Sequence, residues 1–128
     1  MNLFVYGTLR RGIDNEFAAM LARSARFAGT GKVQGELYLV AHYPGLILGG
    51  HDWVVGDVFE LDSGGETLRL LDEYEAGEPF RRVEAAGVLD SGEWVEAQVY
   101  IYTGETGGKL RIESGDFVEW LGHAENGD

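Results

Sequence analysis

The sequence predicts an α+β fold in which mostly antiparallel strands form a β-barrel, flanked by two or three short helices. Glycine supplies 20 of the 128 residues and proline only 2, a balance typical of short strands joined by tight turns. Most apolar segments alternate with polar residues at the period of a strand, and few have helical spacing. The length fits a single domain over residues 1–128, with a loosely ordered tail after about residue 121.

The first half of the chain is predicted to hold one helix among several strands. Leu3–Tyr6 is a continuous apolar run, which favours a central strand buried on both faces. Asp14 is placed to cap a short amphipathic helix that ends near Arg23. Three further apolar segments predict strands: Lys32–Val40, Leu46–Leu48 and Trp53–Leu61.

The second half begins with the clearest helix, Glu66–Tyr74, which follows the Ser63–Gly65 turn and precedes Ala76–Gly77. Two alternating segments, Phe80–Val88 and Trp94–Tyr102, predict a β-hairpin. A glycine-rich loop then leads to a short strand. Asp116 with Glu119 resembles a capping box, which indicates a brief C-terminal helix.

Composition narrows the function classes. The formal net charge is -12, and the ten Lys and Arg residues form no run longer than a doublet, so we expect no nucleic-acid partner. The excess of acidic residues also disfavours binding to an anionic membrane surface. No apolar stretch is long enough to span a bilayer. The absence of cysteine excludes thiol nucleophiles and disulfides. The apolar run Met1–Tyr6 is too short for the core of a signal peptide, so we expect a cytoplasmic protein.

Several familiar sites are excluded by spacing. Neither lysine follows the glycine pattern of a phosphate-binding loop, and no serine lies in a nucleophile elbow. The three histidines, His42, His51 and His123, lie too far apart in sequence for a recognisable metal motif, so we expect no metal site.

Glu75 is the candidate general acid/base. On a helical wheel it falls between Leu68 and Leu71 on the apolar arc of the Glu66–Tyr74 helix. A glutamate in apolar surroundings has a raised pKa and can exchange a proton near neutral pH. Two alternatives stay open: the helix ends before Glu75 and leaves it in solvent, or Glu75 pairs with Arg81 or Arg82.

The loop Tyr6–Gly12 is the second candidate, because a buried strand ends there in a glycine and leads towards a capped helix. Successive amides in such a loop can bind an anion. The alternative is that Gly7 only permits a turn. An anion-binding loop beside a buried glutamate fits a small amino-acid-like substrate.

The segments Phe4–Gly12 with Asn15, Leu71–Glu75 and Arg81–Arg82 together resemble the gamma-glutamylcyclotransferase superfamily, in particular its gamma-glutamylamine cyclotransferase-like branch. The resemblance extends over about residues 1–120 and includes the later segments Val99–Tyr102 and Ile112–Asp116.

This resemblance implies a gamma-glutamylcyclotransferase-like fold. It assigns the acid/base role to Glu75 and substrate binding to Tyr6, Gly7, Thr8, Leu9 and Tyr102. The chain departs from the family pattern at two positions. Ala76 stands where glycine is common, and Phe80 stands where a tyrosine often precedes the arginine pair.

The implied activity is that of a cofactor-independent transferase acting on an acyl group. The α-amine of a small γ-glutamyl amine or peptide attacks its own γ-carbonyl, releasing 5-oxoproline and a free amine. Arg10, Arg11, Arg81 and Arg82 are the nearby cations available to a substrate carboxylate. Two alternatives are a non-catalytic sensor or carrier that uses the same cavity, and an interaction protein that presents a strand edge.

Overall fold

The computed structural model describes residues 1–62, 65–75 and 79–125, with the backbone alone for Glu75, Ala124 and Glu125. The elements follow one another along the chain in the order β1(Asn2–Val5), α1(Glu16–Ser24), β2(Arg26–Leu39), β3(Pro44–Glu60), α2(Glu66–Glu75), β4(Phe80–Leu89), β5(Trp94–Tyr102) and α3(Phe117–Glu125).

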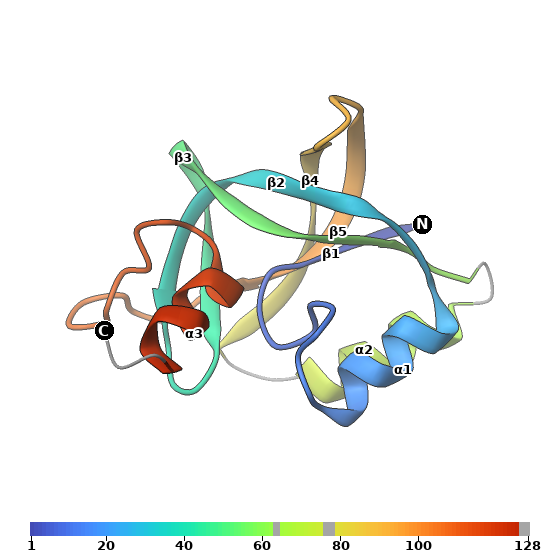
Figure 1. Ribbon diagram of the computed structural model, residues 1–128, viewed down its shortest axis with the longest axis horizontal. Coiled ribbons are helices and arrows are strands. Elements are labelled where there is room, and N and C mark those ends of the chain that lie inside the picture. The colour runs from blue at the N-terminus through green and yellow to red at the C-terminus, as the bar shows by residue number, and fades with distance from the viewer. Residues whose placement is uncertain (63–64, 76–78, 126–128) are drawn as a thin grey trace.

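The strands form a closed barrel in the order β1-β3-β2-β4-β5 (Figure 1). The pair β1–β5 is parallel, and the other four pairs are antiparallel. The predicted α+β class, the mostly antiparallel barrel and its short flanking helices are therefore confirmed. Closure gives each described strand two neighbours, but only two residue pairs join β1 to β5 and only two join β2 to β4.

β1 is buried on both faces, as its apolar run predicts. Phe4 packs into the cluster inside the barrel, whereas Leu3 and Val5 pack into a second cluster that includes residues of α1 and α2. All three side chains are at most 4% exposed. β1 thus separates the barrel core from the helix layer, and the loop that follows it lies between the two.

Helices α1 and α2 lie side by side against one side of the barrel (Figure 1). Leu21 of α1 and Leu71 of α2 are fully buried in the cluster under these helices. The rings of Phe17 and Tyr74 stack on each other with centroids 3.9 Å apart. The prediction that Asp14 caps α1 is wrong: the N-cap is Asn15, whose side chain accepts a hydrogen bond from the Ala18 amide.

The strands between the helices are longer than predicted. β2 begins at Arg26, and β3 runs without a break through the segment predicted as two strands. Register shifts at Phe27/Gly29 and Gln34/Gly35 let the pairing continue past positions where the alternation fails. The short strand predicted near the C-terminus is an isolated bridge between Arg111 and Tyr38.

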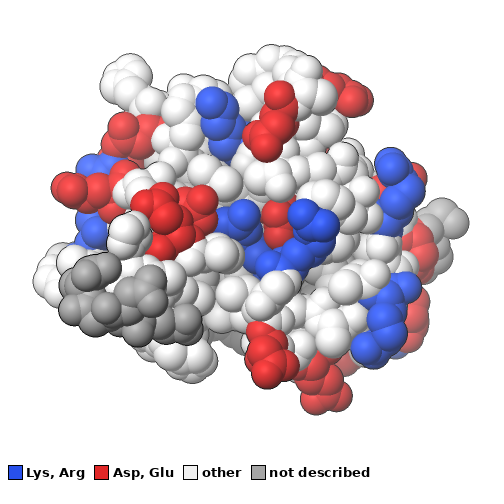
Figure 2. Space-filling model, in the orientation of Figure 1, with Lys and Arg blue, Asp and Glu red and all other residues white. Residues whose placement is uncertain are grey.

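α3 begins as its capping residues predict, because Asp116 accepts a hydrogen bond from the Glu119 amide. It continues to Glu125, beyond the position where the sequence predicts a loose tail, and residues 126–128 lie outside the described part. None of the described helices is long and apolar enough to cross a membrane. Figure 2 shows acidic and basic side chains interleaved over one face of the molecule.

Candidate active site

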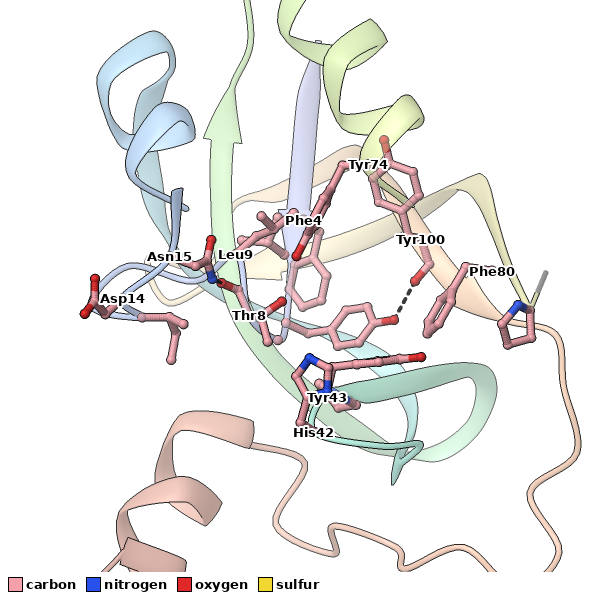
Figure 3. Close-up of a pocket in the computed structure, with 16 residues that line it drawn as sticks. Phe4, Thr8, Leu9, Asp14, Asn15, His42, Tyr43, Tyr74, Phe80 and Tyr100 are labelled. Atoms are coloured by element: carbon pink, nitrogen blue, oxygen red, sulfur yellow. Dashed lines mark hydrogen bonds between the residues drawn. The ribbon is translucent and has the colours of Figure 1, made fainter. Parts of the chain in front are cut away.

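A cavity of about 550 Å³ opens where the loop after β1 meets the β2–β3 turn, the end of α2 and the start of β4 (Figure 3). Its described lining is mostly aromatic and apolar, and comprises Phe4, Val5, Tyr6, Gly7, Thr8, Leu9, Ile13, Asp14, Asn15, His42, Tyr43, Pro44, Tyr74, Pro79, Phe80 and Tyr100. The volume falls within the range usual for small-molecule sites. The structure therefore brings the predicted loop Tyr6–Leu9 to a cavity.

Tyr6 joins the strands under this cavity. Its hydroxyl donates to the Tyr100 carbonyl at 2.6 Å, the dashed line in Figure 3, and accepts from the Leu46 amide at 3.2 Å. The side chain is buried, at 7% exposed. Tyr6 thereby links β5 and β3 beneath the first residues of the loop.

The loop turns immediately after Tyr6. Gly7 approaches Pro44 so closely that an added Cβ would lie 2.8 Å from Pro44 Cγ, so a larger residue here would force the loop and the β2–β3 turn apart. The Gly7 carbonyl accepts from the Arg10 amide at 3.1 Å, and the Thr8 carbonyl accepts from Asn15 Nδ2 at 2.6 Å. Within the described chain, the amides of Gly7, Thr8 and Leu9 donate no hydrogen bond.

Helix α2 ends at this cavity. Tyr74 lines it, and Glu75, the next residue, is the last residue of the helix. The apolar arc predicted for α2 is correct at Leu68 and Leu71, which are 8% and 0% exposed. The helix includes Glu75, so it does not end before this residue. The Glu75 side chain lies outside the described residues.

Asp72 fixes α2 to the barrel, through contacts that span β4 and β5. Its carboxylate accepts from Arg82 Nε at 2.8 Å, from Arg82 Nη2 at 3.1 Å and from the Tyr100 hydroxyl at 2.7 Å. Arg82 also donates to Gln98 at 2.5 Å. Burial raises the pKa of Asp72, but the hydrogen bonds from Arg82 and Tyr100 outweigh this effect and leave the pKa below its usual value.

Three of the four cations predicted near the site, Arg10, Arg11 and Arg82, have partners outside the cavity lining or on its supports. Arg10 is buried between two carboxylates, with Nη1 2.8 Å from Asp116 and Nε 3.6 Å from Asp57. Arg11 lies over the Phe27 ring, 3.5 Å from its centroid. None of the ten Lys and Arg residues lines the cavity, and the residues outside the described part include no Lys or Arg.

The aromatic wall of the cavity has no simple sequence signature. Tyr43 of the β2–β3 turn lies against Phe80 at the start of β4, with centroids 5.8 Å apart. Tyr102 packs behind Phe80 at 5.6 Å and donates to the Glu105 carbonyl. Tyr102 is not one of the described lining residues, so the structure does not bring it to the cavity with the predicted loop.

Comparison with known proteins shows the family. The model for gamma-glutamyl cyclotransferases of the AIG2-like type matches residues 3–119. A protein of Methanocaldococcus jannaschii named as a candidate gamma-glutamylcyclotransferase is 32% identical over 124 residues, covering 94% of this chain and 98% of its own.

Two further relatives are informative. The gamma-L-glutamyl-butirosin B gamma-glutamyl cyclotransferase of Niallia circulans is 41% identical over 78 residues, covering 58% of this chain and 45% of its own length. The crystal structure of an uncharacterized protein from Pyrococcus horikoshii has a TM-score of 0.74 and 28% identity, covering 98% of this chain and 97% of its own. The chain therefore belongs to the AIG2-like gamma-glutamyl cyclotransferase family, as its motifs predict.

Proposed function

We propose that this protein converts a small γ-glutamyl amine or γ-glutamyl peptide into 5-oxoproline and a free amine, with Glu75 as general acid/base. The observation that carries the proposal is the cavity that is lined both by Thr8 and Leu9 of the loop and by Tyr74, which precedes Glu75 at the end of α2. Family membership and the activity named for the Niallia circulans relative support the same reaction class.

The cavity provides what an internal cyclisation needs. The α-amine nitrogen forms a bond to the γ-carbonyl carbon, and the bond from that carbon to the departing nitrogen breaks. Because both reacting groups belong to one flexible chain, holding the chain curled lowers the barrier, by up to about 7–11 kcal/mol in ideal cases. The largely aromatic and apolar lining suits this role, because it offers surface against which the curled chain would pack.

Proton transfer is the second requirement. Glu75 takes the proton that the attacking ammonium must lose and returns a proton to the departing nitrogen, so the total number of protons is unchanged. General acid/base catalysis of this kind contributes about 10²- to 10⁴-fold. The amides of Thr8 and Leu9 bind either the substrate α-carboxylate or the carbonyl oxygen as negative charge develops on it.

The test is incubation with a panel of γ-glutamyl amines and dipeptides, scored for 5-oxoproline. Glu75→Gln keeps the size of the side chain but cannot exchange the proton, so we expect at least a 100-fold loss of turnover with ligand binding retained. The matched control is Glu73→Gln on the same helix, whose carboxylate is exposed and pairs with Arg69. Equal activity of the wild type and Glu75→Gln would refute the role of Glu75.

The same panel separates the enzyme from a sensor or carrier. A sensor binds γ-glutamyl compounds with similar affinity before and after Glu75→Gln and releases no 5-oxoproline in either form. Product from the wild type excludes the sensor, whereas binding without product from any member of the panel contradicts the proposed reaction.

A further inference from the structure

We propose that Asn15 is a positioning residue: through one hydrogen bond it fixes the direction in which the loop amides face the cavity, while its other amide atom caps α1. This inference rests on the proposed function, because it gives the loop amides the task of binding the anionic part of the substrate. Nothing in the sequence distinguishes Asn15 from the neighbouring Asp14 as a cap, since both residue types cap helices well.

The geometry of the peptide unit sets the direction of the amides. In a trans peptide the C=O and the N–H point in opposite directions. The Gly7 carbonyl is held by the Arg10 amide, so the Thr8 N–H in the same peptide unit points the other way. The Thr8 carbonyl is held by Asn15 Nδ2 at 2.6 Å, so the Leu9 N–H is directed in the same manner. These are two of the three loop amides that donate to nothing in the described chain.

Asn15 is well placed to hold the Thr8–Leu9 peptide because both ends of its side-chain amide are engaged. Nδ2 donates to the Thr8 carbonyl, and Oδ1 accepts from the Ala18 amide at 2.7 Å. The side chain therefore cannot rotate without losing one of these bonds. α1 is in turn anchored by Leu21, which is fully buried. The rigid helix thus determines the orientation of a peptide at the cavity wall.

The other end of the loop is fixed independently. The Arg11 amide donates to Asp57 Oδ2 at 2.8 Å, and Asp57 is 3% exposed on β3. The loop is held to the barrel on one side and to α1 on the other. With Arg11 anchored, the Asn15 bond is the contact that decides which way the Thr8–Leu9 peptide faces.

Two substitutions remove the hydrogen bond from Asn15 to the Thr8 carbonyl and keep a residue that caps α1. Asn15→Asp retains a cap acceptor as good as asparagine, but a carboxylate cannot donate and repels the Thr8 carbonyl. Asn15→Ser introduces an uncharged residue that also caps helices, but its side chain is too short to reach the Thr8 carbonyl at the same time. Ala19→Glu is the control, because it adds the same negative charge on an exposed position of α1. Each variant is first checked for an unchanged melting profile.

Two readouts follow, and the second needs no turnover. Activity on the best substrate of the panel gives kcat and KM separately. Titration with 5-oxoproline, followed by amide ¹H–¹⁵N resonances, reports directly on Thr8 and Leu9. We expect folded Asn15→Asp and Asn15→Ser to lose at least about tenfold in kcat/KM, since removing one oriented donor from such a site costs roughly 10²–10³ in kcat in the best-studied case.

The split between the two kinetic constants identifies the bound group. A rise in KM alone indicates that the amides hold the α-carboxylate, whereas a fall in kcat alone indicates the developing oxyanion. Either result supports the inference if the ligand-induced shifts of Thr8 and Leu9 disappear in the variants. Activity within twofold of the wild type, or an equal loss in Ala19→Glu, overturns it.

The proposed function and this inference can fail separately. A wild type that releases no 5-oxoproline but shows Thr8 and Leu9 shifts that vanish in Asn15→Asp refutes the reaction and supports the inference. A wild type that turns over substrate with no shift at either amide supports the reaction and overturns the inference.

Discussion

Asp72→Asn should destabilise the protein, because it removes the charge on which three hydrogen bonds converge. Asparagine offers one acceptor oxygen in place of two, and its NH₂ group faces the Arg82 guanidinium, which only donates. A buried hydrogen bond to a charged group contributes about 1.5–3 kcal/mol. The Asp72 and Arg82 side chains are 40% and 31% exposed, so solvent screening reduces the total expected loss to about 1–2 kcal/mol.

The destabilisation caused by Asp72→Asn should be smaller at acid pH than at neutral pH. Hydrogen bonds hold the pKa of Asp72 below its usual value in the folded protein, despite the opposing effect of burial. A carboxyl with a lowered folded-state pKa stabilises the protein above its unfolded pKa, about 4, and the contribution is lost as pH falls through the folded-state value. The difference in the free energy of unfolding between the wild type and Asp72→Asn should therefore be largest at pH 7 and should decrease below about pH 4.

Urea unfolding followed by tryptophan fluorescence at pH 7 and pH 3 measures both effects. Glu73→Gln is the control, because Glu73 is 67% exposed and solvent screens its ion pair with Arg69. If Asp72→Asn costs no more than Glu73→Gln, or if its cost is the same at both pH values, Asp72 does not anchor α2 as argued.

Three further predictions concern stability. Leu71→Ala, at a fully buried position under the helices, should cost about 2–5 kcal/mol in urea unfolding, and a cost below 1 kcal/mol would contradict the packing described. Gly115→Ala should cost at least about 1 kcal/mol more than Gly108→Ala in the same assay. Both glycines have positive φ, but only at Gly115 does an added Cβ collide with the Trp53 carbonyl, so equal costs would exclude the collision. The free energy of unfolding should rise between 0.1 M and 1 M NaCl, because salt screens the repulsion within a chain of net charge -12, and a fall would show that ion pairs dominate.

The local elements could largely be predicted because their patterns are local. The strand Trp94–Tyr102 has its predicted bounds, and α2 extends one residue past them. The strands around Gly49 and Gly50 could not be predicted as well. Both glycines have positive φ and interrupt the alternation, and the pairing with β2 resumes on either side of them, at Leu48 and at Trp53. The register shifts that make this possible depend on the partner strand, which a local pattern does not contain.

The sequence predicts the loop and the helix of the site, but it does not predict the tertiary contacts that hold them in place. Asn15 rather than Asp14 caps α1, and the contact that accompanies this choice is with Thr8, outside the helix. Arg10 looked available to a substrate, but its partner Asp116 is 106 residues away in sequence. The pairing of Asp72 with Arg82 likewise depends on how α2 lies against the barrel. Each of these contacts is set by tertiary structure.

These corrections change the electrostatic account of substrate binding. A γ-glutamyl group carries a carboxylate, the protein has a net charge of -12, and no Lys or Arg lines the cavity. In the proposed reaction we therefore assign the attraction for the anionic group to oriented backbone amides, whose field depends on the conformation of the loop and not on a side-chain charge. Selectivity for the substrate would thus be a property of the turn at Gly7 and of the two anchors that hold it, one from α1 and one from β3.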